Sequence, residues 1–165
     1  MLTQEQRRFY QDNGYLLVEG QFTVVEAGEF RQEAHALIER LSQYTDINPT
    51  WGSARMLAEG TKLFHCHNVQ FYSAAFTQLL VDERLTAAAA DLIGSPNVQL
   101  HHNKLFIKPP EKGSPFPMHQ DYPYFPHERH TMLAGVIHFD DAPLEKGCIR
   151  VMPGSHKRGA IEHNP

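Results

Sequence analysis

Apolar positions in the first part of the chain recur every three or four residues, which is the spacing of one face of an α-helix. The spacing predicts a helix that begins after Thr23 and ends near residue 42, with its apolar face formed by Ala27, Phe30, Ala34, Leu37, Ile38 and Leu41. Three shorter helices are predicted at residues 4–13, 71–79 and 83–93. Thr3 and Gln6 form a capping-box pattern at the first of them, and Gly94 ends the last.

The pattern changes near residue 97 to short apolar runs, which are typical of strands. Strands are predicted at residues 98–102, 105–107, 119–122, 132–139 and 148–152, with turns at 140–147 and 153–155 and an earlier buried strand at 15–18. A loop is predicted around Asn48, Pro49, Trp51 and Gly52, and residues 53–65 carry no assignment. We therefore predict one α+β domain over residues 1–165, with helices (about 1–96) packed on the antiparallel strands (about 97–165) of a barrel or a sandwich.

Composition and charge exclude several classes of partner. Apolar residues make up 41% of the 165, which indicates a globular chain. The 15 basic and 19 acidic residues provide no positive field, so no nucleic-acid partner is expected. No apolar run is long enough to span a bilayer, and no membrane partner is expected. The polar N-terminus and the two cysteines, Cys66 and Cys148, predict a reducing, cytoplasmic setting. Nothing indicates an oligomeric state.

Residues 118–122 carry the strongest candidate for chemistry. Side chains alternate between faces along an extended segment, so His119 and Asp121 are predicted to point the same way, with Cα atoms about 6.6 Å apart. One imidazole nitrogen and one carboxylate oxygen suit a divalent metal such as Fe(II). Nine of the 11 histidines lie between His65 and His156, which is compatible with metal or acid–base work and equally with surface positions.

Two segments around this pair resemble the phytanoyl-CoA dioxygenase family. They are residues 117–126, PMHQDYPYFP, and residues 147–159, GCIRVMPGSHKRG. Residues 2–18 and 104–110 resemble the family as well, so the similarity runs along nearly the whole chain. The resemblance implies a double-stranded β-helix (jelly-roll) barrel with N-terminal helices outside it. It also implies one non-haem Fe(II), held in part by His119 and Asp121, with 2-oxoglutarate as co-substrate, O2 as oxidant and hydroxylation of an unactivated C–H bond in a small molecule.

The resemblance also implies residues that the 165 do not supply. The family's second histidine ligand follows the Pro-Gly-Ser-His segment at a distance, and an arginine that pairs with 2-oxoglutarate comes after it. We therefore expect this chain to be the N-terminal part of a longer protein and to be inactive alone. His138, His156 and His163 are local substitutes for the third ligand, and we expect none of them to serve.

Further site residues are predicted with alternatives left open. Lys104 and Gln120 are candidates for holding 2-oxoglutarate, although Lys104 can equally reach solvent and Gln120 can make a structural hydrogen bond. Three aromatic residues can wall the substrate pocket or pack as core: Tyr122, Tyr124 and Phe125. Four histidines, His101, His102, His127 and His130, can bind substrate carboxylates or lie at the surface. Cys148 is expected to be a small core residue rather than a nucleophile. Arg150 can point into the barrel or outward into solvent.

Two other functional classes share these features. One is a catalytically incomplete fragment or non-enzymatic jelly-roll protein that lacks the third metal ligand. The other is a barrel metalloprotein such as an isomerase, which would release no succinate from 2-oxoglutarate.

Overall fold

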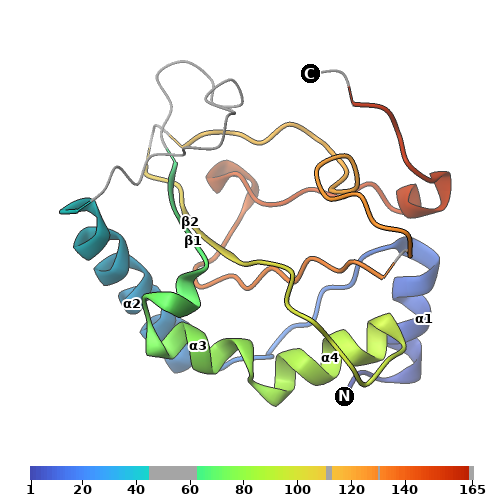
Figure 1. Cartoon of the computed structure of the whole chain (residues 1–165), viewed down its shortest axis with the longest axis horizontal. Coiled ribbons are helices and arrows are strands. Elements are labelled where there is room, and N and C mark those ends of the chain that lie inside the picture. The colour runs from blue at the N-terminus through green and yellow to red at the C-terminus, as the bar shows by residue number, and fades with distance from the viewer. Residues whose placement is uncertain (45–62, 111–112, 130, 164–165) are drawn as a thin grey trace.

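The computed structural model describes residues 1–44, 63–110, 113–129 and 131–163. The predicted loop around Asn48, Pro49, Trp51 and Gly52 lies outside the described residues, as does His130. The described elements are, in order, α1 (Gln4–Asn13), α2 (Val24–Ser42), β1 (Phe64–His67), η2 (Val69–Phe71), α3 (Ala74–Leu80), α4 (Glu83–Ile93), β2 (Lys104–Ile107), η3 (Leu144–Lys146) and η4 (Ser155–Arg158). Figure 1 shows α2 beside the short sheet, α3 and α4 following one another below it, and α1 on the opposite side of the molecule from α2.

The predicted helices are confirmed, and their ends follow from their capping residues. The side chains of Thr3 and Thr23 each accept a hydrogen bond from the backbone amide of the third helical residue. The side chain of that residue in turn accepts one from the backbone amide of the threonine, so both capping boxes are present. Asp82 caps α4, and Gly94 ends it with a φ of 75°, a left-handed conformation that glycine adopts readily.

The sheet has two antiparallel strands in the described residues, and sequence reasoning found only one of them. Cys66 pairs with Leu105 and His67 with Lys104. The four residues of β1 include two histidines and show no long apolar run, which is why the stretch carried no assignment. β1 comes before residue 97, the predicted boundary between the helical and the barrel part, and β2 comes after it. The division into a helical and a barrel part, and the single domain, stay predictions.

The remaining predicted strands are wrong for the described residues. Segments 15–18, 98–102, 119–122, 132–139 and 148–152 form no strand ladder there, and no jelly-roll barrel is present in that part of the chain. Several of their apolar side chains are exposed, with Leu17 at 69%, Val136 at 57% and Ile149 at 56%. Apolar periodicity indicates which face of an extended segment is buried, but a strand also needs a neighbouring backbone to bond.

The core lies where α2 and α3 meet the sheet. Leu37 is fully buried and packs in a cluster with Ala34, Ile38, Cys66, Val69, Phe76, Leu79 and Leu105. Phe30 and Phe76 stack with Phe139, at ring-centroid distances of 5.4 and 6.0 Å to that residue. Phe139 thereby packs the segment that follows β2 against α2 and α3. Among the described residues, no helix combines the length and the apolar character needed to cross a bilayer.

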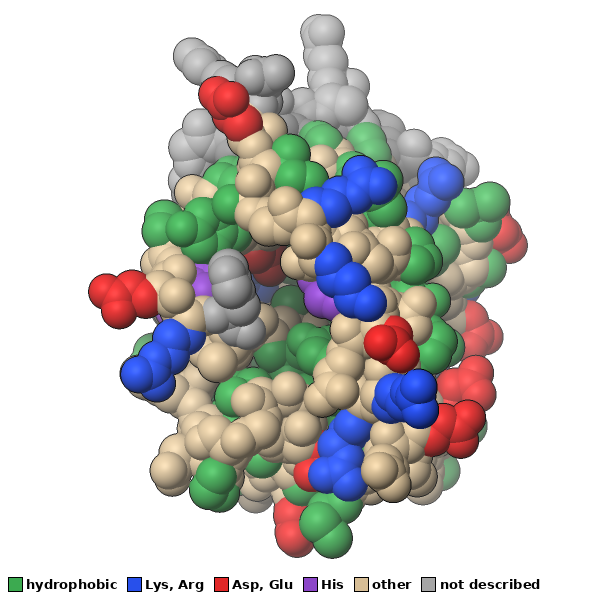
Figure 2. All heavy atoms as spheres, turned by 90° about the vertical axis from the view of Figure 1, so that its right-hand side faces the viewer, with side chains coloured by type: hydrophobic (Ala, Val, Ile, Leu, Met, Phe, Trp, Pro, Cys, Tyr) green, Lys and Arg blue, Asp and Glu red, His purple; other side chains and the backbone are tan. Residues whose placement is uncertain are grey.

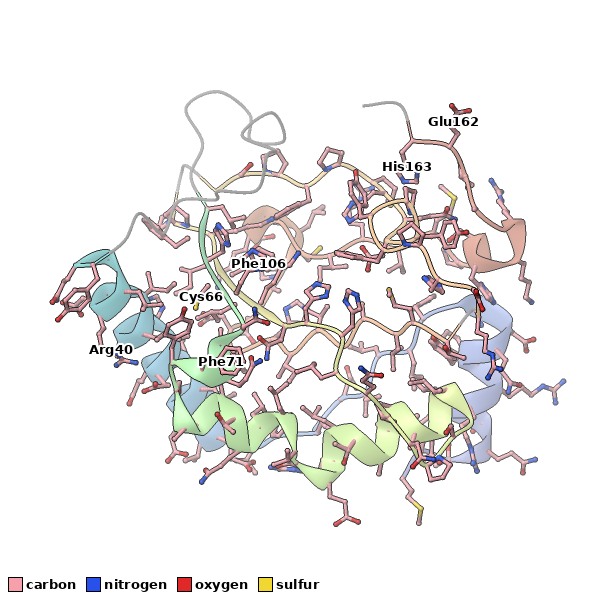
Figure 3. All side chains as sticks on the ribbon, in the orientation of Figure 1. Arg40, Cys66, Phe71, Phe106, Glu162 and His163 are labelled. Atoms are coloured by element: carbon pink, nitrogen blue, oxygen red, sulfur yellow. The ribbon has the colours of Figure 1, made fainter. Side chains whose placement is uncertain are left out.

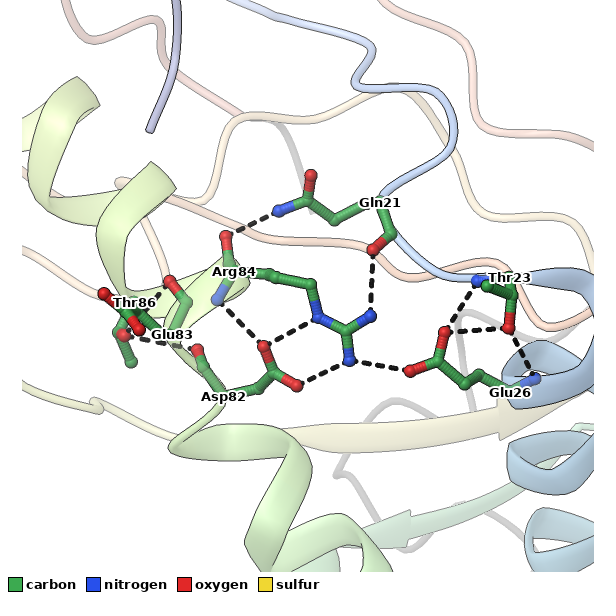
Figure 4. A network of polar contacts seen from close by, with 7 residues as sticks. All are labelled: Gln21, Thr23, Glu26, Asp82, Glu83, Arg84 and Thr86. Atoms are coloured by element: carbon green, nitrogen blue, oxygen red, sulfur yellow. Dashed lines mark hydrogen bonds and ion pairs between the residues drawn. The ribbon is translucent and has the colours of Figure 1, made fainter.

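A polar network joins the start of α2 to the start of α4 (Figure 4). The guanidinium of Arg84 donates to Asp82 at 2.7 Å and to Glu26 at 2.8 Å. Its side chain also donates to the carbonyl of Gln21 at 3.3 Å, and the Gln21 amide donates back to the Arg84 carbonyl. Because one arginine serves the N-cap of α4 and the capping box of α2, the two helix starts are fixed relative to each other.

Candidate metal centre

His119 and Asp121 bring one nitrogen and one oxygen together. The Nε2 atom of His119 lies 3.6 Å from Oδ1 of Asp121. About a third of the His119 side chain and nearly half of the Asp121 side chain are exposed. The backbone between them is no strand, contrary to the prediction. Instead a turn begins at Asp121, whose carbonyl accepts from the amides of Tyr124 and Phe125, each at 3.0 Å. The turn directs the carboxylate toward the ring.

The hydrogen bond on the far side of the ring fixes which nitrogen faces Asp121. Nδ1 of His119 lies 2.7 Å from the carbonyl oxygen of Pro117, and a carbonyl can only accept, so Nδ1 carries the proton. In the neutral ring, Nε2 then presents its lone pair to Asp121. A donor to a backbone carbonyl on the second nitrogen is the usual arrangement for metal-binding histidines.

The spacing of these two atoms fits one divalent metal ion. First-row metals bind imidazole nitrogen and carboxylate oxygen at about 2.0–2.2 Å each, so one ion reaches both atoms when they are closer than about 4.2 Å. The observed 3.6 Å meets that condition. The described residues contain no group of three His, Cys, Asp or Glu side chains that could hold a metal. The pair is therefore a partial donor set.

Gln120, between the two donors, is bound to a segment 40 residues away. Its side-chain amide donates to the carbonyl of Gly159 at 3.0 Å, and its side-chain oxygen accepts from the amide of Ile161 at 2.8 Å. Its own backbone amide donates to Nε2 of His163 at 2.7 Å. The side-chain NH2 group and the side-chain oxygen of Gln120 thus both make structural hydrogen bonds. A contact between Gln120 and 2-oxoglutarate stays a prediction.

Both ring nitrogens of His163 have hydrogen-bond partners, one of which is the backbone amide of Gln120. Its Nδ1 lies 2.8 Å from the carbonyl of Ile161, so Nε2 is the acceptor that Gln120 engages. Figure 3 shows His163 on the last described segment, reaching back toward the loop that carries Gln120. His138 is exposed. The ring of His156 is bound elsewhere.

His156 docks the Pro-Gly-Ser-His segment on the end of α1. Its Nε2 bonds the carbonyl of Gln11 at 2.9 Å, and the amide of Gly154 donates to the carbonyl of Asn13 at 2.8 Å. These bonds satisfy two of the carbonyls that a helix C-terminus leaves free. Gly14, with a φ of 79°, lies directly under the ring, and a Cβ there would be 2.7 Å from Cγ of His156. The turn predicted at residues 153–155 is confirmed.

The three predicted aromatic residues face different neighbours. The ring of Tyr124 lies edge-on to His119 with centroids 5.9 Å apart. Tyr122 instead packs on His127 at 5.2 Å. Phe125 packs on His102 at 4.8 Å. The ring of Tyr124 thus contacts the candidate metal donor His119, and a pocket formed by all three aromatic residues stays a prediction.

Four histidines and one lysine lie on or next to the two strands, and we call them the histidine–lysine cluster: His65, His67, His101, His102 and Lys104. His65 and His67 lie on β1 with ring centroids 5.0 Å apart, and His101 and His102 lie before β2 at 4.8 Å. Nζ of Lys104 stands 5.8 Å from the centre of the Phe125 ring. Sequence reasoning missed His65 and His67. The alternating pair His-x-His in residues 65–67 was the available signal.

The cluster disfavours additional positive charge. Partial burial, and then the neighbouring His65, Lys104 and His102, lower the pKa of His67 to about 4. Burial also lowers the pKa of His102, with Lys104 and His101 acting in the same direction and Asp121 opposing. Burial lowers the pKa of Lys104, again against the attraction of Asp121. Asp121 thus interacts with the cluster as well as with His119.

Two remaining candidates are placed as follows. Cys148 is half-buried, while Cys66, on β1, is buried in the core, where burial raises the pKa of its thiol. Arg150 is exposed in the described structure, which is the solvated position of the two considered.

The chain is similar in sequence to known proteins. A sequence model described as phytanoyl-CoA dioxygenase (PhyH) matches residues 10–165. A probable alpha-ketoglutarate-dependent hypophosphite dioxygenase of Stutzerimonas stutzeri is 29% identical over 160 residues, which cover 96% of this chain and 55% of that protein. The peroxisomal phytanoyl-CoA dioxygenase of Homo sapiens is 25% identical over 99% of this chain and 50% of its own length. No solved structure matches the chain.

A third relative broadens the chemistry represented. The ectoine dioxygenase of Streptomyces coelicolor is 27% identical over 88% of this chain and 48% of its own length. These three relatives are dioxygenases by name. The chain belongs to the phytanoyl-CoA dioxygenase family. It spans about half the length of the curated relatives it matches.

Proposed function

We propose that this chain is part of an Fe(II)- and 2-oxoglutarate-dependent dioxygenase that hydroxylates an unactivated C–H bond of a small organic substrate. One observation carries the proposal: Nε2 of His119 and Oδ1 of Asp121 face each other at 3.6 Å, with the histidine proton held on the opposite nitrogen. Membership in a family whose named relatives are dioxygenases supports the same chemistry.

In this proposal His119 and Asp121 are two of the three protein ligands of a facial triad. When bound, the iron activates O2 and couples the oxidative decarboxylation of 2-oxoglutarate to substrate hydroxylation. The residues of the chain provide orientation. Pro117 holds the His119 tautomer, the turn after Asp121 directs its carboxylate, and Tyr124 lies against the His119 ring.

The third metal ligand, a second histidine, and the arginine for 2-oxoglutarate are proposed to come from outside the described residues. The absence of a three-donor group within the described part of the chain supports this, as does the greater length of the relatives. In the same way we propose that the 165 residues alone are inactive. Lys104 is proposed to contact an anionic ligand, while Tyr122, Tyr124 and Phe125 are proposed to border the substrate.

The test is succinate release from 2-oxoglutarate by the protein expressed from its complete gene, with Fe(II) and O2 supplied. We expect release by the wild type and its loss, by at least a hundredfold, in Asp121→Ala and His119→Ala. The matched controls His35→Ala and Asp141→Ala remove exposed residues of the same types and should leave the rate unchanged.

Other outcomes would point to the alternative classes. Iron binding without succinate release would favour a barrel metalloprotein of another activity. Absence of both iron binding and succinate release would favour a non-enzymatic protein. Either result would contradict the proposal.

A further inference from the structure

Three hydrogen bonds join residues 159–163 to Gln120, the residue between the two candidate metal donors. The side-chain amide of Gln120 donates to the carbonyl of Gly159 at 3.0 Å, and its side-chain oxygen accepts from the backbone amide of Ile161 at 2.8 Å. The backbone amide of Gln120 donates to Nε2 of His163 at 2.7 Å. One segment therefore engages both the side chain and the backbone of residue 120.

These bonds reach much farther along the sequence than those of the two donors. They span 39 to 43 residues. Nδ1 of His119 bonds the nearby carbonyl of Pro117, and the carbonyl of Asp121 accepts from amides in its own turn. Bonds within a turn fix its shape, whereas bonds to a distant segment fix its position in the fold. Gln120 provides bonds of this second kind.

The ring of His163 is prepared for its bond to residue 120. Its Nδ1 lies 2.8 Å from the carbonyl of Ile161, and because a carbonyl can only accept, Nδ1 carries the proton. Nε2 then has its lone pair free for the Gln120 amide. The ring of Tyr124 lies edge-on to that of His163 at 6.3 Å and to that of His119 at 5.9 Å. His163 thus contacts the aromatic neighbour of a donor as well as the turn.

The segment is also connected to α1. It begins directly after η4, and His156 of η4 bonds the carbonyl of Gln11 on α1 at 2.9 Å. Figure 2 faces the side of the molecule on which α1 and this segment lie, and it shows a hollow bordered by histidine and hydrophobic side chains. Residues 159–163 therefore connect a docked helical turn to the turn of the metal donors at an open part of the surface.

Exposed donors need such support to bind a metal well. His119 and Asp121 are partly exposed and lie in a turn without strand partners in the described residues. A metal site needs its ligands held within about 0.5 Å of the productive geometry, which depends on the residues that surround them. Loss of one supporting residue typically weakens metal binding by about 10- to 100-fold.

We propose that residues 159–163 position the metal-binding turn, and that His163 and Gln120 are positioning residues that act through the backbone of residue 120. The proposal rests on the proposed function for the identity of the metal centre. It goes beyond that function because it assigns a role to a segment that contains no metal ligand.

The test combines Mn(II) affinity with amide hydrogen exchange in the protein expressed from its complete gene. His163→Phe removes the acceptor Nε2 but keeps an aromatic ring beside Tyr124, and Gln120→Ala removes the two side-chain bonds. His163→Gln restores an acceptor oxygen. His35→Phe and Gln78→Ala are matched controls, because both residues are exposed, on α2 and α3 respectively.

We expect His163→Phe and Gln120→Ala each to weaken Mn(II) binding by about tenfold, and both controls to leave it unchanged. In the metal-free protein, the amide of Gln120 should exchange about tenfold faster in His163→Phe, because it has lost its acceptor. The amide of the core residue Leu37 should exchange at nearly the wild-type rate, which separates local release from general unfolding. His163→Gln should recover most of the affinity and of the protection.

Two results would overturn the proposal. One is Mn(II) binding of equal strength in wild type and in His163→Phe. The other is an equal acceleration of exchange at Leu37 and Gln120, which would give His163 a role in overall stability alone. If His163→Phe does not fold, Gln120→Ala decides by the same Mn(II) comparison. A wild type that binds no Mn(II) would contradict the proposed function and this inference with it, so the two failures are distinguishable.

Discussion

The imidazole of His119 directs its Nε2 atom at Oδ1 of Asp121, 3.6 Å away, while its other nitrogen is bound to the carbonyl of Pro117 at 2.7 Å. Two lone-pair atoms therefore converge on one point. In the absence of a cation this arrangement is electrostatically unfavourable for the neutral ring, and a proton or a metal ion between the atoms relieves it. The pair is thus prepared for a cation by its hydrogen bonds and by the turn after Asp121.

Replacement of Gly14 by alanine tests the docking of His156 on α1. A Cβ at Gly14 would lie 2.7 Å from Cγ of His156, and the backbone there has a positive φ. We expect Gly14→Ala to lower the free energy of unfolding by at least about 2 kcal/mol, the sum of left-handed strain and overpacking. Urea denaturation measures the change.

Gly94→Ala is the matched control for that variant. Gly94 has nearly the same φ, 75°, but a Cβ there would meet nothing within 4 Å. Its cost should be the backbone strain alone, about 1 kcal/mol. If the two variants lose equal stability, the ring of His156 does not pack on Gly14 in solution.

The Arg84 network predicts a contribution to stability that is lost in acid. The hydrogen bond from Arg84, followed by those from Thr23, lowers the pKa of Glu26 to about 2. The unfolded chain takes up this proton at its ordinary pKa of 4.5, so the contribution of Glu26 to stability is complete above pH 4.5 and is lost as the pH falls toward 2. Arg84→Met should therefore reduce the unfolding free energy at pH 7 and flatten its decline over this range.

Arg8→Met is the control for the Arg84 variant, because Arg8 pairs with Asp12 only at 3.9 Å on an exposed face of α1. Urea titrations at several pH values between 2 and 7 measure both. An unchanged pH profile for Arg84→Met would show that the network of Figure 4 does not form in solution.

His67 predicts a second pH dependence at milder acidity. Its pKa of about 4 in the fold lies below the ordinary 6.5, so the unfolded chain binds this proton first. Stability should then decrease as the pH falls from 6.5 to 4. His67→Gln should remove part of that decrease, whereas His35→Gln, on the exposed face of α2, should leave it intact. Equal slopes for wild type and His67→Gln would contradict the burial of His67 among basic neighbours.

Helices were predictable from the sequence because their signals are local. Thr23 and Glu26 cap the same helix whose apolar positions include Leu37, so every determinant lies within one segment. The same holds for Asp82 and Gly94 at the ends of α4.

Strands and the site were less predictable because their partners are distant in sequence. Phe64 pairs with Ile107, and Gln120 bonds Ile161, across gaps that no local pattern encodes. Residues 132–139 have a strand-like pattern without a strand partner in the described residues. The common direction of His119 and Asp121 was anticipated from strand alternation, but a turn produces it. His67 was missed because its importance depends on Lys104 across the sheet.

Paramagnetic broadening by Mn(II), in NMR spectra of the 165-residue chain, tests most directly whether His119 and Asp121 bind the metal. Mn(II) accepts the same nitrogen and oxygen donors as Fe(II), and broadening detects weak binding by a partial donor set. We expect the signals of residues 119–121 to broaden first, and Asp121→Asn to abolish the effect. Broadening centred on the histidine–lysine cluster, or unchanged in Asp121→Asn, would contradict the assignment of this pair as the metal centre.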